Sequence, residues 1–153
     1  HNGEINTIEG NRRWAQARRG VWASPQLDIG EFDETVTMHG SDSQTLDNML
    51  EWMLLGGMDL LQAMRILMPP ATQSLEYKDA DLAAFYEYYA INSEPWDGPA
   101  GVVMCDGRHA ACTLDRNGLR PARWTLSQDG IFVIASEAGV WDVAATDFRP
   151  NKH

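Results

Sequence analysis

The hydrophobic pattern of the sequence changes once, near Pro99, and this change limits the folds that the chain can adopt. Before it, apolar residues recur every three or four positions, a spacing typical of helices with one buried face. After it come short runs typical of β-strands, separated by Asp106-Gly107 and Asp129-Gly130, which favour tight hairpin turns. Helices followed by antiparallel strands predict a layered α+β fold.

Three helices are predicted between residues 41 and 91. Ser41 or Ser43 can cap the first, which the glycine pair at 56–57 ends, and Asp59 can cap the second, which the proline pair at 69–70 closes. The third spans about 81–91. The apolar stripe of the first helix is Leu46, Met49, Leu50, Met53 and Leu54, and that of the third is Leu82, Phe85, Tyr86 and Tyr89.

A shorter helix is predicted nearer the N-terminus, where Asn11 can cap a helix that runs through Ala17 and stops at Gly20. Residues 21–40 favour a loop with a short strand at 35–37. This loop carries an acidic run that we expect to be solvated, formed by Asp28, Glu31, Asp33 and Glu34.

Four strands are predicted at residues 100–105, 109–114, 122–127 and 131–135, joined as one antiparallel meander. Cys105 and Cys112 fall on the first two strands and have no metal-binding spacing. We therefore expect both to be small core side chains rather than a disulfide, which suits a reducing compartment.

Composition bounds the partners of the chain. Its length of 153 residues is that of one domain, and its net charge of −10 argues against nucleic acid or an anionic membrane as a partner. No apolar run approaches the ~20 residues that span a bilayer, and no segment resembles a signal peptide. The histidines have no paired spacing and no glycine-rich nucleotide loop occurs, so neither a metal site nor a nucleotide site is expected.

The Asn-Gly pair at residues 2–3 can contribute to chemistry. Asn2 carries an amide donor on a short arm, and the backbone N–H of Gly3 can approach another atom with no Cβ in the way. Two converging N–H donors can form an oxyanion hole. Asn-Gly is also common in plain turns, so the pair alone leaves both interpretations open.

Five motifs follow one another along the chain: HNGEINTIEGNRRW at residues 1–14, Ser41-Asp42-Ser43 before Leu46-Asp47-Asn48, EPWDGP at 94–99, LDRNGLRPAR at 114–123 and ASEAGV at 135–140. Together they resemble the glutamine amidotransferase domain of the large subunit of glutamate synthase, over nearly the whole chain. The Asn-Gly and Ser-Asp pieces are shared by the wider class II of amidotransferases, which use an N-terminal cysteine nucleophile. EPWDGP and LDRNGLRPAR are typical of glutamate synthase.

The resemblance implies roles for three residues. Asn2, through its side-chain amide, and Gly3, through its backbone N–H, match the oxyanion hole that stabilises the intermediate formed when a thiolate attacks glutamine. Asp42 matches the carboxylate that binds the α-amino group of glutamine. A carboxylate in the first turn of a helix is also favourable by itself, and the two roles are compatible.

The resemblance also implies a fold. This is the four-layer αββα sandwich of N-terminal-nucleophile hydrolases, with residues 1–153 as part of a single domain truncated at both ends. The strand leading into His1 would belong to one sheet and the meander largely to the other. We expect Arg120 and Arg123 to be structural, bracing carboxylates at the sheet edge, and residues 96–98 to form a shaped loop.

The activity implied by the resemblance is hydrolysis of L-glutamine to glutamate and ammonia, with ammonia passing to a separate flavin domain that uses 2-oxoglutarate. FMN and an iron–sulfur cluster are expected on other domains, with no cofactor in this chain. The other expected partners are the remaining domains of the large subunit and a small electron-transfer subunit, in the bacterial cytosol or a plastid. The nucleophilic cysteine and an upstream arginine that clamps the glutamine carboxylate are not among these residues, so we expect the chain alone to be inactive.

Two alternatives remain at this point. One is a non-catalytic binding or assembly module with the same fold. The other is an amidotransferase domain of a different class II enzyme, feeding ammonia to a nucleotide or sugar acceptor.

Overall fold

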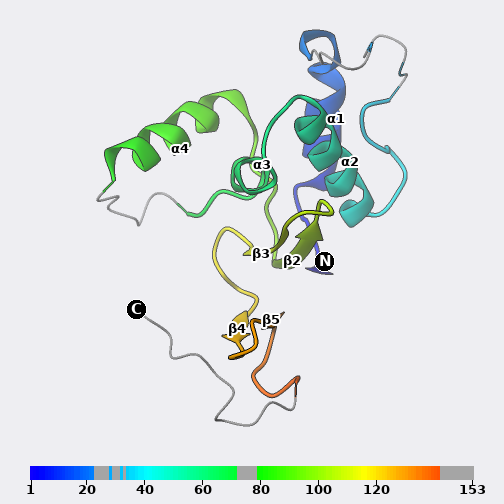
Figure 1. The fold of residues 1–153 in the computed structure, drawn as a ribbon. Coiled ribbons are helices and arrows are strands. Elements are labelled where there is room, and N and C mark those ends of the chain that lie inside the picture. Colours follow the sequence, from blue (N-terminus) through cyan, green and yellow to red (C-terminus); the bar gives the residue numbers. More distant parts are fainter. Residues whose placement is uncertain (23–27, 29–31, 33, 72–78, 142–153) are drawn as a thin grey trace.

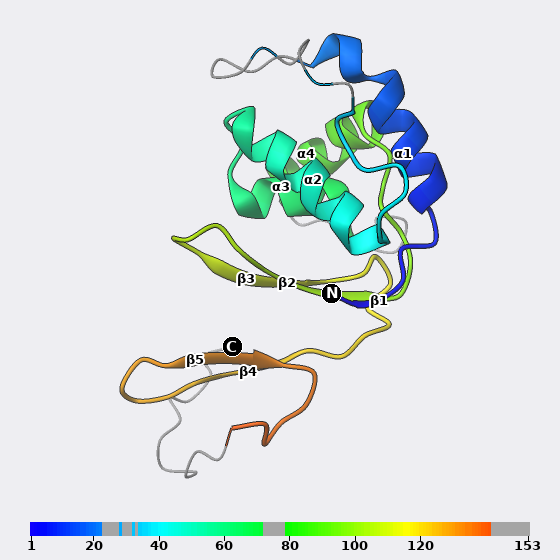
Figure 2. The same cartoon turned by 90° about the vertical axis from the view of Figure 1, so that its right-hand side faces the viewer.

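The computed structural model describes residues 1–22, 28, 32, 34–71 and 79–141. Within them, a layer of helices covers a three-stranded sheet, and a second hairpin lies beyond that sheet (Figures 1 and 2). The elements in chain order are β1 (Asn2–Gly3), α1 (Ile8–Ala17), the 3₁₀ helix η1 (Arg19–Val21), α2 (Asp42–Leu55), α3 (Leu60–Leu67), α4 (Ala80–Asn92), β2 (Ala100–Cys105), β3 (Ala110–Leu114), β4 (Arg123–Leu126) and β5 (Phe132–Ala135). The α+β class is confirmed.

The strands form two sheets rather than one meander. β2 lies between β1 and β3 and is antiparallel to both, whereas β4 pairs with β5 in a separate sheet. Figure 2 shows the helices on one side of the β1-β2-β3 sheet and the β4–β5 hairpin on the other. The predicted four-stranded meander was therefore wrong, because the Asp115 carboxylate folds residues 117–120 into a turn after β3, and β4 pairs with β5 alone.

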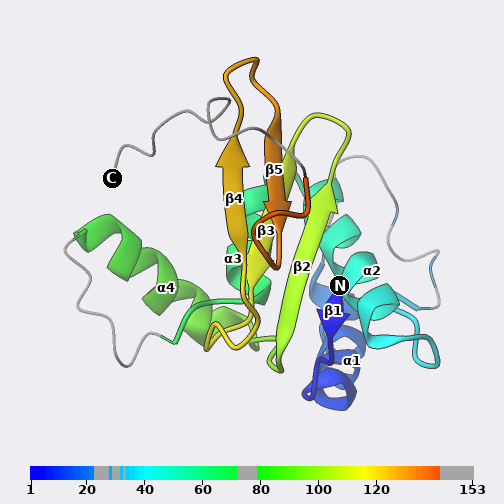
Figure 3. The ribbon, with the colours of Figure 1, turned by 90° about the horizontal axis from the view of Figure 1, so that it is seen from below.

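The position of β1 also differs from the expectation. Asn2 lies opposite Gly101 and Gly3 opposite Ala100, so the first strand shares a sheet with β2 and β3. The prediction that it would lie in a different sheet from most of the later strands was wrong. Figure 3 shows the start of the chain at the edge of this sheet, beside α2.

The core lies between the helices and one face of β2. Ala100, Val102 and Met104 alternate along β2 and are buried, which places Gly101 and Val103 on the opposite face. The predicted stripe of α2 is confirmed: Leu46, Met49 and Leu50 are buried, and Met53 and Leu54 pack against the same core. Among the residues that the structure describes, the largest fully buried side chain is that of Trp96, from the EPWDGP motif.

Most predicted helix starts are confirmed. The Ser41 hydroxyl accepts a hydrogen bond from the N–H of Gln44 at 3.1 Å, and the Asp59 carboxylate accepts one from the N–H of Gln62 at 2.9 Å. α4 begins at Ala80 after the cap Asp79, close to the predicted bound. Only Tyr86 of its predicted stripe is buried, so α4 lies more exposed than its pattern indicated.

α1 begins earlier than predicted, with Thr7 at the N-cap position and Asn11 inside the helix. Asn11 does not cap because its buried side chain forms tertiary contacts. Its Oδ1 accepts from the Thr7 hydroxyl at 2.6 Å, and its Nδ2 donates to the carbonyl of Pro95 at 3.2 Å.

Two further expectations need correction. Residues 35–37 form a bend and not a strand, because Thr37 N–H donates to the Asn48 side chain and Trp52 donates to the Thr35 carbonyl. Cys105 is exposed and Cys112 half-buried, so Cys105 is not a core residue, although both cysteines are free as expected. Of the acidic run, Asp28 and Glu34 are exposed as expected, whereas Glu31 and Asp33 lie outside the described residues.

Candidate functional site

Gly3 lies against the backbone that leads into β2, in a conformation that suits glycine alone. Its φ is +137°, and a Cβ at this position would lie 1.7 Å from the carbonyl oxygen of Pro99. The next residue, Glu4, donates its N–H to that same oxygen at 3.1 Å. A side chain at position 3 would therefore push β1 away from β2.

The hydrogen-bond pattern of this ladder sets the direction of the Gly3 N–H. Bonded and non-bonded pairs alternate in an antiparallel ladder, and the Glu4–Pro99 pair is bonded, so the Gly3–Ala100 pair is not. In agreement, the N–H and C=O of Ala100 point the other way, to Asp115. The Gly3 N–H consequently points outward from β1, which is an edge strand of the described sheet.

Asn2 is exposed beside Gly3, on a known face of the sheet. It lies opposite Gly101, and cross-strand partners share a face. That face is turned away from the helices, toward the β4–β5 hairpin (Figure 2). An amide donor and a backbone N–H with no partner among the described residues thus lie on adjacent residues at one sheet edge.

The EPWDGP motif clamps the segment that follows β1. The N–H of Thr7 donates to the carbonyl of Asp97 at 3.3 Å, and the N–H of Asp97 donates to the Thr7 hydroxyl at 2.9 Å. Gly98 has φ +147°, and a Cβ there would lie 2.1 Å from the carbonyl oxygen of Glu4. Residues 96–98 form the shaped loop that we expected, and its tight contacts hold residues 4–7 in place.

Asp42 reaches the same segment from the first turn of α2. Its Oδ2 accepts from the N–H of Ile5 at 2.8 Å and lies 3.1 Å from His1 Nε2, while Oδ1 accepts from the N–H of Ser43 at 2.7 Å. The Asp42 side chain is 18% exposed. These contacts occupy three of about four acceptor positions of a carboxylate and leave room for one more donor.

The structure therefore brings Asp42 to the segment that directly follows Asn2 and Gly3, although Asp42 is far from both residues in the sequence. Asp42 lies on the helix side of the sheet and the Asn2 side chain on the other. A ligand can meet both only around the free edge of β1.

A cleft of about 490 Å³ opens next to His1, between the start of α2 and the edge of β2. Its polar wall comes from α2 and the residue before it, and its apolar wall mostly from β2. The lining residues are His1, Ser41, Ser43, Gln44, Leu46, Asp47, Leu50, Met64, Val102, Val103, Met104 and Cys105. Asn2, Gly3 and Asp42 are not among its lining residues, although Asn2 follows His1 and Asp42 lies between Ser41 and Ser43 in the sequence.

Sequence reasoning missed Asp115, a buried carboxylate in LDRNGLRPAR. It accepts from four backbone N–H groups, those of Ala100, Asn117, Leu119 and Arg120, at 3.0–3.3 Å. Burial raises the pKa of the Asp115 carboxyl, but these donors outweigh it, and the pKa lies below its ordinary value. The signal for this role was an Asp placed two residues before an Asn-Gly turn.

Arg120 and Arg123 form no ion pair with a carboxylate of the described residues, which corrects that part of the expectation. The Arg120 backbone N–H binds Asp115, and its Cβ lies 3.6 Å from the place that a Cβ on Gly101 would take. Arg123 begins β4 and lies opposite Ala135.

The described residues hold no group of three or more His, Cys, Asp or Glu that fits a metal ion. The sequence has two cysteines, fewer than the four thiolates of a typical iron–sulfur cluster, so its residues do not fit such a cluster. Among the helices of the described residues, none has the length and apolar composition to cross a membrane.

Comparison with known proteins identifies the family. The model of the class-II glutamine amidotransferases matches residues 1–152. The chain belongs to this family. It is 42% identical to the NADH glutamate synthase of Schizosaccharomyces pombe over 142 residues, which are 91% of this chain and 7% of that protein.

Two other relatives of this amidotransferase chain are glutamate synthases as well. The ferredoxin-dependent enzyme of Antithamnion sp. is 41% identical over 94% of the chain and 10% of its own length. The large chain of the NADPH enzyme of Bacillus subtilis is 37% identical over the same shares. The chain thus spans about a tenth of the length of these relatives, and the expected similarity to their amidotransferase domain is confirmed.

Proposed function

We propose that this amidotransferase domain hydrolyses L-glutamine to glutamate and ammonia, with Asn2 and Gly3 as the two donors of the oxyanion hole. The observation that carries the proposal is the outward-pointing N–H of Gly3 at the sheet edge, next to the amide of Asn2. Each donor of such a pair typically contributes roughly 3–4 kcal/mol to transition-state stabilisation.

The reaction follows from this geometry and from the family. A cysteine, supplied from outside these residues, gives its thiol proton to its own α-amine, and the resulting thiolate attacks the glutamine carboxamide carbon and forms a C–S bond. The carbonyl oxygen gains the negative charge and accepts hydrogen bonds from Asn2 Nδ2 and the Gly3 N–H. Collapse of this intermediate breaks the C–N bond, ammonia leaves with a proton delivered by the α-amine of the cysteine, and water then hydrolyses the thioester.

Asp42 completes the proposed site. Its carboxylate keeps one acceptor position beyond Ile5, Ser43 and His1, and the α-ammonium of glutamine fits that position. Asp42 also holds the segment that follows Gly3, so its replacement would alter both substrate affinity and the shape of the oxyanion hole.

The similarity to glutamate synthases supports a wider assignment for the intact protein. Residues 1–153 would be part of a single amidotransferase domain, with the helix layer and the two sheets as three layers of an αββα sandwich (Figure 2). Ammonia would pass to 2-oxoglutarate at a separate flavin domain in the cytosol or a plastid. FMN, an iron–sulfur cluster and a small electron-transfer subunit would belong to those other parts, and this chain alone would be inactive.

The test is Asn2→Ala in the intact gene product that carries this chain, measured as ammonia release from glutamine. Asn92→Ala is the control, because Asn92 is an exposed asparagine at the end of α4 and takes no part in the sheet that holds β1. We expect Asn2→Ala to lower kcat at least about tenfold with little change in KM, since the lost donor acts in the transition state. In Asn2→Ala, a glutamine-like electrophile should still label the nucleophilic cysteine.

An unchanged rate in Asn2→Ala would remove Asn2 from the oxyanion hole. An intact protein that neither releases ammonia nor is labelled, with all synthase substrates supplied, would instead support a non-catalytic binding or assembly module. Ammonia release without transfer to 2-oxoglutarate would favour a class-II enzyme with another acceptor.

A further inference from the structure

Asp115 lies at the end of β2 that faces Gly3. Its backbone N–H donates to the carbonyl of Ala100 at 2.7 Å, and its Oδ1 accepts the N–H of Ala100 at 3.3 Å. Asp115 therefore binds both polar backbone atoms of Ala100. Ala100 is the residue directly opposite Gly3.

The same carboxylate shapes the turn that follows β3. Its oxygens accept the N–H groups of Asn117, Leu119 and Arg120, which folds residues 115–120 back on themselves. This turn brings the Cβ of Arg120 to 3.6 Å from the position of a Cβ on Gly101. Gly101 lies opposite Asn2, so the network of Asp115 fixes the cross-strand partners of both oxyanion donors.

We propose that Asp115 is a positioning residue for the oxyanion hole, which it aligns through Ala100 and Gly101 without touching the substrate. The inference rests on the proposed function of Asn2 and Gly3. The tolerance for misalignment is small, because a displacement of about 1 Å at a reacting group can cost on the order of a hundredfold in rate.

Asp106, at the other end of β2, provides a comparison for Asp115. Asp106 follows β2 directly, and its Oδ1 accepts the N–H groups of Arg108 and His109 at 2.8 and 2.7 Å. Asp106 and Asp115 thus perform the same local task of binding backbone N–H groups in a turn next to this sheet. Only Asp115 does so beside Gly3.

The experiment compares Asp115→Asn with Asp106→Asn in the intact gene product. The asparagine keeps the size of the side chain, but it replaces an acceptor oxygen by an NH₂ group that faces N–H donors. We expect Asp115→Asn to lower kcat for ammonia release by about ten- to a hundredfold, with KM within about twofold. Asp106→Asn should leave both parameters within about twofold. Equal effects of the two variants, or a fall in soluble yield with an unchanged kcat, would show a purely structural role.

A double variant separates this inference from the proposed function. If Asp115 acts through the oxyanion hole, Asn2→Ala combined with Asp115→Asn should lose much less than the product of the two single losses. Losses that multiply would contradict the positioning role while leaving the role of Asn2 intact. No loss in Asn2→Ala alone would instead contradict the proposed function.

Asp115→Glu serves if the asparagine variant does not fold. It keeps the charge but moves the carboxylate oxygens by one methylene. A fall in kcat for ammonia release with KM within about twofold would then support the positioning role. A glutamate variant with unchanged kcat would overturn the positioning role.

Discussion

Gly3 shows how a single residue can couple the fold to the candidate site. Its positive φ and its contact with the Pro99 carbonyl let β1 lie against the start of β2. That placement in turn directs its own N–H outward. Conformation and candidate chemistry therefore depend on the same missing side chain.

We predict that Gly3→Ala lowers ammonia release by the intact gene product at least about a hundredfold. The added methyl group would overlap the Pro99 carbonyl and force an unfavourable φ, which displaces the donor. Gly10→Ala is the control, because a Cβ there meets nothing within 4 Å and alanine favours the interior of α1. Full activity in Gly3→Ala would mean that β1 tolerates a shift without loss of the oxyanion hole.

At the scale of elements, a buried arginine joins α1 to the start of α2. Arg12 donates from Nε and Nη2 to the hydroxyl of Thr45 at 3.2 and 3.1 Å, and its Nη2 also donates to the carbonyl of Gly40. Thr45 is fully buried, and its hydroxyl donates a hydrogen bond to the carbonyl of Ser41 at 2.9 Å. Arg12 and Thr45 together hold the start of α2 in the position from which Asp42 accepts the N–H of Ile5.

Thr45→Val should therefore weaken the contact between α1 and α2. The shape of the side chain is kept, but a buried guanidinium loses its acceptor, which costs about 2 kcal/mol and lowers the thermal midpoint of the domain by roughly 4–8 °C. Thr113→Val on half-buried β3 should change the midpoint little, because among the described residues that hydroxyl forms only a 3.4 Å contact, with the Leu114 carbonyl. Differential scanning calorimetry of the intact gene product tests both variants, and equal midpoints would contradict the role given to Thr45.

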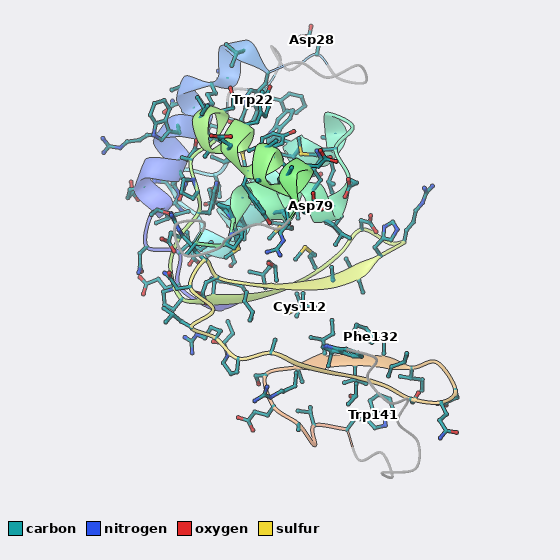
Figure 4. The ribbon with its side chains drawn as sticks, turned by 90° about the vertical axis from the view of Figure 1, so that its left-hand side faces the viewer. Trp22, Asp28, Asp79, Cys112, Phe132 and Trp141 are labelled. Carbon is teal, nitrogen blue, oxygen red and sulfur yellow. The ribbon has the colours of Figure 1, made fainter. Side chains whose placement is uncertain are left out.

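At the scale of the whole molecule, the two sheets face each other across apolar surfaces that remain exposed. Val103 on the first sheet is 70% exposed, and Trp124 and Phe132 on the second are 51% and 53% exposed. The rings of Trp124 and Phe132 lie 5.7 Å apart. Figure 4 shows Phe132 on the second sheet and Cys112 on the first. Exposed apolar sheet surface favours association between molecules.

We predict that the isolated chain self-associates and that Trp124→Thr with Phe132→Thr reduces this association. Threonine keeps a preference for strands while removing the aromatic surface. Ile91→Gln on α4, which replaces an 81% exposed apolar residue away from the sheets, should have little effect. Sedimentation velocity of the three proteins measures the outcome, and a monomeric, cooperatively unfolding wild-type chain would contradict the prediction.

The sequence by itself determined the local features and the family. The caps Ser41 and Asp59 and the stripe of α2 were predicted because capping and helical periodicity act over a few residues. The order of five motifs predicted an amidotransferase domain, and the family match confirmed it. The residues Asn2, Gly3 and Asp42 came from the same motifs, and their catalytic roles remain predictions.

Only the tertiary structure decided which segments meet. No local pattern specifies that Gly3 pairs with Ala100, that Asp42 binds Ile5, or that β4 and β5 leave the first sheet. Asn11 was misjudged for the same reason, since its side chain binds the carbonyl of Pro95 far away in the sequence, and the bond of Asp115 to Ala100 was equally beyond local patterns. Such contacts form only when the chain folds and buries polar groups that are distant in the sequence. Each buried group then needs a hydrogen-bond partner, and that partner is whichever group the tertiary structure places beside it.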